Sequence, residues 1–192
     1  ESVEEMKKTG ELHGQVLVDG EPMTRRRARI KPPARVHHDR VGYVLLEGPA
    51  GQVSAGRQSG SWWRINRNRS REEVSEDVFL LYLDHGPYVN NATYAYAVYP
   101  DCRGEDFARL TDADEMTIVD NEPDRQAVYD GKRNVLAAAF YEAGAVTLPD
   151  GATVRVSEPC LLLLKRRADG TAATVANPQN RKLDVTVTLD AG

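Results

Sequence analysis

Short stretches of alternating apolar and polar residues, separated by turn-forming dipeptides, recur along almost the whole chain and restrict it to a β-rich fold. The segment LDVTVTL (183–189) places an apolar side chain at every second position, which predicts a strand with one face in water. Asp150-Gly151 and Asp169-Gly170 each separate two such segments and favour tight hairpins, because both residue types accept a positive φ. No segment combines helical periodicity with helix length, so the sequence predicts an all-β, antiparallel β-sandwich architecture.

The strand pattern changes once, which divides the chain into two parts. DVFLLYL (77–83) is apolar at every position except the first and is predicted to be covered on both faces, and ATYAYAVYP (92–100) is expected to return antiparallel to it. RGEDFARLTDAD (103–114) is the one mixed acidic segment that could form a short helix or a linker. We therefore predict a larger sandwich in residues 1–112 and a smaller one in residues 113–192.

The charge of the chain is unevenly spread. The 192 residues carry a net charge of −4, yet residues 1–71 contain 14 Lys and Arg against 8 Asp and Glu, and the remainder contains 11 against 21. The N-terminal part is therefore a candidate face for an anionic partner, although a plain solvated loop explains its basic residues equally well. Those residues are Arg25, Arg26, Arg27, Arg29, Lys31 and Arg35.

The two cysteines and the N-terminal sequence limit the chemistry further. Cys102 and Cys160 form no CxxC or Cys/His spacing of a metal site. Cys160 opens the apolar run CLLLL and is expected to be a small buried residue, and a disulfide between the two cysteines stays open. The chain shows no signal-peptide core and no membrane-length apolar run, so we expect any export signal to lie upstream of residue 1.

Five sequence pieces, in order, resemble the family-8 polysaccharide lyases, which include hyaluronate, chondroitin AC and xanthan lyases. Three of them are similar to the central β-domain of that family, which is part of a large super-sandwich, and two are similar to its small C-terminal β-sandwich. The resemblance runs from about His37 to the end and is weaker before it. The pieces are HHDRVGYVLLEG, SGSWWRIN, EEVSEDVFLLYLDHGPYVNNATYAYAVYP, DRQAVYDGKRNVLAAAFYEAG, and ATVRVSEPCLLLLKR with VANPQN.

The resemblance implies cleavage of an acidic, uronate-containing polysaccharide such as hyaluronan, chondroitin or xanthan by β-elimination. In this family the catalytic Asn, His, Tyr and Arg come mainly from a helical toroid domain that precedes the β-domains. No segment here has that helical pattern, so no catalytic residue transfers, and this chain alone is predicted to be inactive. The implied partners are an anionic polysaccharide and an upstream toroid of the same enzyme, secreted or at the cell surface. No cofactor, metal, nucleic acid or membrane is expected. The alternative is a non-catalytic β-sandwich module that binds anionic glycans.

Two stretches contain candidate site residues. In SWWRINRNRSR (61–71), a tryptophan offers a flat apolar surface for a sugar ring, and arginines match carboxylate or sulfate groups. The candidate polysaccharide-contacting residues are Trp63, Arg64, Arg67 and Arg69, and a solvated loop is the alternative for them. Trp62 occupies the usual tryptophan position of the family that the chain resembles, and this resemblance implies that Trp62 lies in the core. His85, next to Asp84, could be a catalytic base, but a turn residue is the favoured interpretation. His37 and His38 point to opposite faces of a strand and cannot chelate one metal together.

Overall fold

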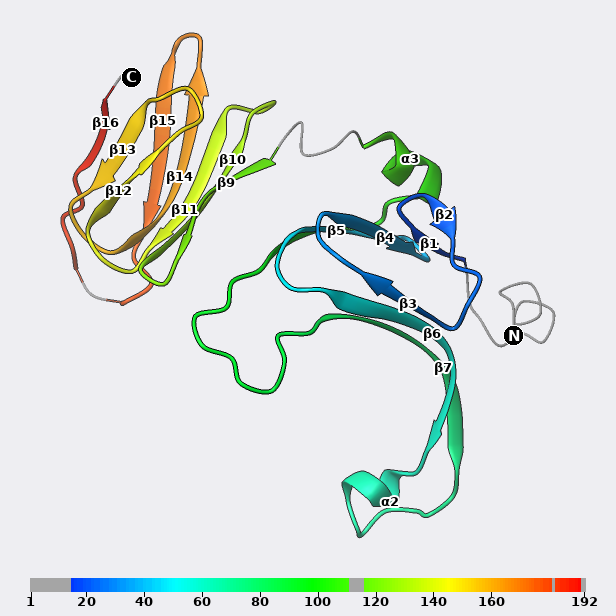
Figure 1. Ribbon diagram of the computed structural model, residues 1–192. Helices are drawn as coiled ribbons and strands as arrows, with labels where there is room; N and C mark the ends of the chain where they lie inside the picture. The colour runs from blue at the N-terminus through cyan, green and yellow to red at the C-terminus, as the bar shows by residue number, and fades with distance from the viewer. Residues whose placement is uncertain (1–14, 111–115, 181, 191–192) are drawn as a thin grey trace. The chain divides into compact units, whose positions relative to one another are not determined.

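The computed structural model describes residues 15–110, 116–180 and 182–190 of the chain. Antiparallel strands make up most of these residues, and the only helices among them are short, so the predicted all-β class is confirmed (Figure 1). The chain divides into two compact units, an N-terminal unit of residues 1–110 and a C-terminal unit of residues 111–192. The predicted boundary between residues 112 and 113 lies outside the described residues.

The first sheet of the N-terminal unit has five antiparallel strands in the order β2-β1-β4-β5-β8. A two-residue turn joins its β4 and β5, and Asp39 in this turn adopts a left-handed backbone with a φ of 55°. Asp is among the few residues that tolerate this conformation. The strands are β1 (Val16–Val18), β2 (Glu21–Pro22), β4 (Ala34–His38), β5 (Val41–Glu47) and β8 (Ala95–Tyr99).

The second sheet of this unit has three strands in the order β3-β6-β7, with bounds Arg27–Ile30, Gly51–Gly60 and Val74–Leu83. The strands β6 and β7 are each ten residues long and pair along their whole length as a hairpin. The turn at residues 48–51 carries the chain from β5 in the first sheet to β6 in the second. The long hairpin extends away from its sheet and ends in the one-turn helix α2 (Trp62–Ile65) (Figure 1).

One apolar core joins the two sheets of the N-terminal unit. Partly buried residues of β7, among them Phe79, Leu81 and Leu83, pack against it. Since these side chains occupy alternate positions of β7, the strand turns one face to the core. The buried members of the core are Val16, Met23, Ile30, Ala34, Val36, Leu45, Val53 and Ala55.

Two expectations for this unit were wrong. The strand of residues 77–83 is not covered on both faces, because Leu80 and Tyr82 are exposed and no described element packs over them. The strand β8 does not return beside β7; it pairs with β5, with Tyr96 opposite Leu45. The connection of residues 84–94 is long enough to cross to the other sheet, whereas a local hairpin would need a much shorter turn.

A short helix, α3 (Gly104–Arg109), forms within the mixed segment where a helix or linker was predicted. Its Phe107 is buried, and its ring lies over Gly42 of β5, where a side chain would collide with it. The guanidinium of Arg35 lies 4.8 Å from the centre of this ring and donates to the main-chain oxygens of Phe107 and Leu110. Arg35 therefore caps the C-terminal end of α3, where a positive charge is favourable.

The C-terminal unit is a sandwich of a five-stranded and a three-stranded sheet, in the orders β15-β14-β11-β10-β9 and β12-β13-β16. Both predicted Asp-Gly hairpins are confirmed, since β12 pairs with β13 and β14 with β15. The strands are β9 (Met116–Glu122), β10 (Arg125–Asp130), β11 (Val135–Phe140), β12 (Gly144–Thr147), β13 (Thr153–Val156), β14 (Cys160–Arg167), β15 (Gly170–Ala176) and β16 (Val187–Asp190).

The core of the C-terminal unit includes Leu136 and Cys160, neither of which is exposed at all. The burial of Cys160 confirms the prediction, and both cysteines of the chain are free. Along β14 the side chains of Leu162 and Leu164 are buried, whereas Leu161 is exposed. The leucine run therefore follows the period of a strand that has one face toward the core. The other buried residues are Ala127, Tyr129, Ala138, Phe140, Val146, Leu148, Ala152, Val154 and Val156.

Candidate functional site

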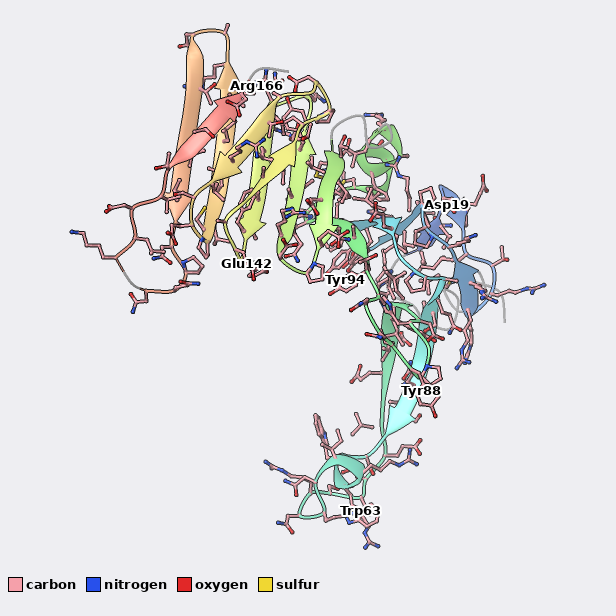
Figure 2. All side chains as sticks on the ribbon, turned by 60° about the vertical axis from the view of Figure 1, so that its left-hand side comes forward. Asp19, Trp63, Tyr88, Tyr94, Glu142 and Arg166 are labelled. Carbon is pink, nitrogen blue, oxygen red and sulfur yellow. The ribbon has the colours of Figure 1, made fainter. Side chains whose placement is uncertain are left out.

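The segment that joins β6 to β7 is held in place by its own backbone. The amide of Trp63 donates to the carbonyl oxygen of Ser70 at 3.0 Å, and the amide of Asn66 donates to that of Trp62 at 2.9 Å. The amide of Arg69 donates to the carbonyl oxygen of Asn66 at 3.0 Å. These bonds fold residues 61–73, which we call the hairpin tip, into a compact loop. Trp63 lies at the far end of the hairpin (Figure 2).

The two tryptophans of the hairpin tip have different surroundings. The guanidinium carbons of Arg67 and Arg71 lie 3.8 and 4.5 Å from the centre of the Trp63 ring, as in cation–π pairs. Trp62 is 60% exposed, so the expectation that it belongs to the core was wrong. It lies on the one-turn helix α2, whose residues are all at least partly exposed, together with Ile65, which is 82% exposed. The tip thus presents an apolar surface beside a tryptophan that two arginines contact.

The arginines of the hairpin tip give it a local positive charge. The structure brings Arg64, Arg67 and Arg69 together on this loop, and all three are exposed. Within the described part of the chain, none of the three forms an ion pair with a carboxylate. Their donor groups are therefore available to an oxyanion, for which a guanidinium is well shaped.

His85 lies apart from the hairpin tip, in the turn after β7. The carboxylate of Asp84 accepts the amide of Gly86 at 2.9 Å, which is typical of an Asx turn. No hydrogen bond between Asp84 and His85 occurs among the described residues, and the His85 ring contacts the edge of Tyr94 at a centroid distance of 5.7 Å. In this geometry the carboxylate stabilises the turn and does not orient the imidazole. A catalytic role for His85 remains untested.

A groove in the N-terminal unit was not expected from the sequence. It has a volume of about 590 Å³ and is bordered by β5, β7 and β8. Five of its lining residues are tyrosine or phenylalanine, and among the described residues that line it His85 is the one that could bear a positive charge. The lining residues are Tyr43, Leu45, Phe79, Leu80, Leu81, Tyr82, Leu83, His85, Tyr94 and Tyr96. The tyrosine repeat in ATYAYAVYP was the available signal, but it was assigned to a strand that returns beside residues 77–83.

The adjacent histidines His37 and His38 face opposite sides of β4, as predicted. His37 is buried and donates from Nε2 to the carbonyl oxygen of Cys102 at 2.8 Å, beside Phe107. The ring of His38 instead stacks on Phe79 of β7, with centroids 4.5 Å apart. Burial of the His38 ring lowers its pKa below the ordinary value; Asp39 opposes this shift, and His37 adds to it.

The stability of the N-terminal unit should therefore depend on the charge of His38. Because the folded pKa is lowered, the unfolded chain takes up a proton more readily, so stability is lost as the pH falls through about 6.5 toward the folded pKa. The substitution His38→Phe keeps a ring on Phe79 and removes the titration. We expect its free energy of unfolding, measured by urea denaturation, to fall less between about pH 7 and pH 5 than that of the unsubstituted chain. Equal falls in the two proteins would contradict this assignment.

The described residues contain neither a cluster of metal ligands nor a membrane-spanning helix. These residues contain no group of three or more His, Cys, Asp or Glu side chains placed to hold a metal ion. None of the helices in the described ranges has the length and apolar character needed to cross a membrane.

The family of the chain follows from matches that cover both units. Residues 2–111 match the family model of the polysaccharide lyase family 8 super-sandwich domain, and residues 117–186 match that of the C-terminal β-sandwich domain of the same family. The chain belongs to polysaccharide lyase family 8. The resemblance stated from the sequence is thereby confirmed, and so is the combination of a super-sandwich part with a C-terminal sandwich.

Similar proteins within this family are longer enzymes. The chain is 34% identical over 128 residues to chondroitinase-AC of Pedobacter heparinus, which is 67% of this chain and 18% of that protein. It is 36% identical over 162 residues to hyaluronate lyase of Thermasporomyces composti, covering 82% of this chain and 20% of that protein. A solved chondroitinase AC lyase, studied in complexes with oligosaccharides, superposes with a TM-score of 0.75 at 26% identity, over 94% of this chain and 29% of that one. The chain therefore spans about a fifth of the length of the curated relatives it matches.

Proposed function

We propose that this chain is the β-sandwich portion of a lyase that cleaves an acidic, uronate-containing polysaccharide. The observation that carries the proposal is the match of two consecutive family-8 domain models to the two units of the chain. Relatives whose names refer to chondroitin and hyaluronate support a glycosaminoglycan as the substrate class. Such an enzyme would act outside the cell or at its surface, where these polymers occur.

The reaction would be a β-elimination. A base removes the proton on the carbon next to the uronate carboxylate, a carbon–carbon double bond forms, and the glycosidic oxygen leaves with a proton from an acid. This chemistry needs a base, a proton donor and a positive charge or hydrogen-bond donors at the carboxylate, all converging on one sugar. His85 could supply one of these groups, a base, but among the described residues no hydrogen bond to a partner orients its ring. We therefore propose that a helical domain outside residues 1–192 carries the catalytic residues.

An activity assay tests this proposal. We expect the purified 192-residue chain to leave hyaluronan, chondroitin and xanthan intact, with no rise in the ultraviolet absorbance of unsaturated uronides. A version extended upstream over the length found in the relatives is expected to be active. A sustained rise in this absorbance with the 192-residue chain, lost in His85→Ala, would overturn the proposal that the catalytic residues lie outside this chain. An extended protein that binds anionic glycans and never cleaves them would favour the alternative, a non-catalytic binding module.

We further propose that the hairpin tip contacts the polysaccharide, with Trp63, Arg64, Arg67 and Arg69 as the contributing residues. The unpaired, exposed guanidinium groups support contact with carboxylates or sulfates, and exposed Trp62 adds an apolar surface on which a sugar ring could stack. Arg67 lies over the ring of Trp63, so its own contact with a glycan would keep that tryptophan in place.

The salt dependence of binding tests the hairpin tip. We expect the affinity for chondroitin oligosaccharides to fall steeply as salt rises, because exposed charges are screened beyond about 8 Å at physiological ionic strength. Replacing Arg64, Arg67 and Arg69 together with alanine should abolish most of the binding and leave thermal stability nearly unchanged. The matched control replaces three exposed arginines of the same unit, Arg25, Arg27 and Arg29. Equal losses in both triple variants, or equal affinity for neutral glycans, would argue against a specific site at the tip.

A further inference from the structure

The indole ring of Trp63 contacts two guanidinium groups at the far end of the hairpin (Figure 2). The guanidinium carbon of Arg67 lies 3.8 Å from the centre of this ring, and that of Arg71 lies 4.5 Å from it. Trp63 is partly buried, whereas its neighbour Trp62 is 60% exposed. Trp63 is therefore placed to hold the two arginines, and the open tryptophan surface of the hairpin tip is that of Trp62.

The described residues do not neutralise these two guanidinium groups. Arg67 and Arg71 are both exposed, and neither forms an ion pair with a described carboxylate. The acidic residues Glu72 and Glu73 follow directly in the chain, but they are exposed as well. Two like charges on one ring repel each other, so an anion that contacts both guanidinium groups would remove an unfavourable interaction.

The backbone of the hairpin tip fixes the position from which Arg71 extends. The amide of Trp63 donates to the carbonyl oxygen of Ser70, the residue before Arg71. On the other side, the amide of Glu72 donates to Ser70 Oγ at 3.0 Å. These bonds restrict the backbone on both sides of Arg71, so less conformational freedom is lost when its guanidinium binds a ligand.

The presence of two guanidinium groups decides which anion fits best. A single guanidinium can already bind both oxygens of a planar carboxylate through two parallel N–H···O bonds. A sulfate ester has three terminal oxygens in a tetrahedral arrangement, so it can accept bonds from two guanidinium groups at once. Because both guanidinium carbons lie within 4.5 Å of one ring centre, both flexible side chains can reach a single group beside that ring.

A sugar that carries the sulfate would also find an apolar surface on the hairpin tip. Trp62 and Ile65 lie on α2 and are 60% and 82% exposed. An indole offers a large, flat apolar face against which a pyranose ring can pack. Inorganic sulfate would gain nothing from this surface, so the tip favours a sulfated sugar over the free anion.

We propose that Arg67 and Arg71, held on the ring of Trp63, form a sulfate-ester site that makes the hairpin tip selective for sulfated over unsulfated glycosaminoglycan. The two arginines contact the sulfate, and Trp63 is a positioning residue that acts through them. This assignment rests on the proposed function, because it requires the hairpin tip to contact the polysaccharide. It goes beyond that function by adding Arg71, by giving Trp63 a supporting role and by naming the group that is recognised.

Binding of sulfated and unsulfated chondroitin oligosaccharides of equal length to the 192-residue chain tests this site. The only two tryptophans of the chain, Trp62 and Trp63, lie in the hairpin tip, so tryptophan emission reports binding there. We expect Arg71→Ala to lower the affinity for the sulfated oligosaccharide about tenfold or more, and that for the unsulfated one less than about twofold. The matched control Arg57→Ala removes another exposed arginine of the same hairpin and should leave the ratio of the two affinities unchanged.

Two further variants test the supporting role of Trp63. Trp63→Leu removes the ring and should abolish the preference for the sulfated oligosaccharide. Trp63→Phe keeps an aromatic ring for the cation–π contacts and should retain most of this preference. Trp62 remains in both variants as the fluorescent reporter. If Trp63→Leu weakened the binding of both oligosaccharides by the same factor, the assignment of Trp63 as a positioning residue would be overturned.

Three other results would overturn the sulfate site. Equal losses for sulfated and unsulfated oligosaccharides in Arg71→Ala would leave the hairpin tip as a polysaccharide contact without sulfate recognition. Inorganic sulfate that binds as tightly as the sulfated oligosaccharide would show an anion site that does not recognise a sugar. Failure of the unsubstituted chain to bind either oligosaccharide would refute the tip contact and the sulfate site together, whereas cleavage by the version extended upstream would still support the proposed lyase function.

Discussion

Replacing Gly51 with alanine is expected to lower the free energy of unfolding of the N-terminal unit by about 3 kcal/mol or more. Gly51 opens β6 opposite Leu83, and a β-carbon there would lie 2.0 Å from the carbonyl oxygen of Tyr82 and 3.0 Å from the Cα of Leu83. Both neighbours are main-chain atoms, which cannot move aside as a flexible side chain can. The hairpin would have to separate at the end nearest the core.

The same strand supplies a matched control for this substitution. Gly60 closes β6 opposite Val74, and a β-carbon there would meet nothing within 4 Å. Gly60→Ala is therefore expected to be neutral, or stabilising by about 0.4–1 kcal/mol, through the smaller conformational freedom of the unfolded chain. Urea denaturation followed by circular dichroism measures both variants. A loss in Gly60→Ala as large as that in Gly51→Ala would show that the close approach of β6 to β7 is not the cause.

The sequence predicted most accurately the features that depend on residues close together in the chain. The Asp150-Gly151 and Asp169-Gly170 hairpins were correct, because a tight turn depends on the few residues that form it. The burial of Cys160 was correct as well, since a cysteine that opens an apolar run behaves as a small apolar residue. Such local signals are sufficient for the C-terminal unit, in which most strands pair with a neighbour in the sequence.

The pairing of β8 shows where local patterns fail. The alternating tyrosines of β8 are compatible both with a hairpin to β7 and with a crossing to β5. Only the packing of the two sheets decides which strand β8 pairs with. The exposure of Leu80 was missed for the same reason, because an apolar run does not reveal whether its second face is covered by this chain or by another segment.

The candidate site was predicted in part. The sequence located the aromatic and basic residues of the hairpin tip, since they are contiguous in the chain. It assigned Trp62 the wrong surroundings, because which ring of an adjacent pair is exposed depends on the backbone turn of α2. The groove had no contiguous signal, because its lining comes from three strands of two sheets.

Replacing Leu136 with alanine is expected to destabilise the C-terminal unit by about 2–5 kcal/mol, the range for truncating a buried leucine. Leu136 lies in β11 between Tyr129 of β10 and Leu164 of β14, and its side chain is fully buried in the core. Alanine would remove apolar contacts and leave a cavity between the two sheets, which close-packed neighbours fill only in part. Leu161→Ala, on the exposed face of β14, is the control and should cost less than about 1 kcal/mol.

This substitution also tests whether residues 1–112 and 113–192 are separate domains. If each part has its own core, Leu136→Ala should speed the exchange of amides in β10 and β11 and leave those of β4 and β5 unchanged. Hydrogen exchange at low denaturant concentration resolves the two sets in one sample. Faster exchange of β4 and β5 by the same factor would mean that the chain unfolds as one cooperative structure. In that case the two sandwiches would be parts of one domain.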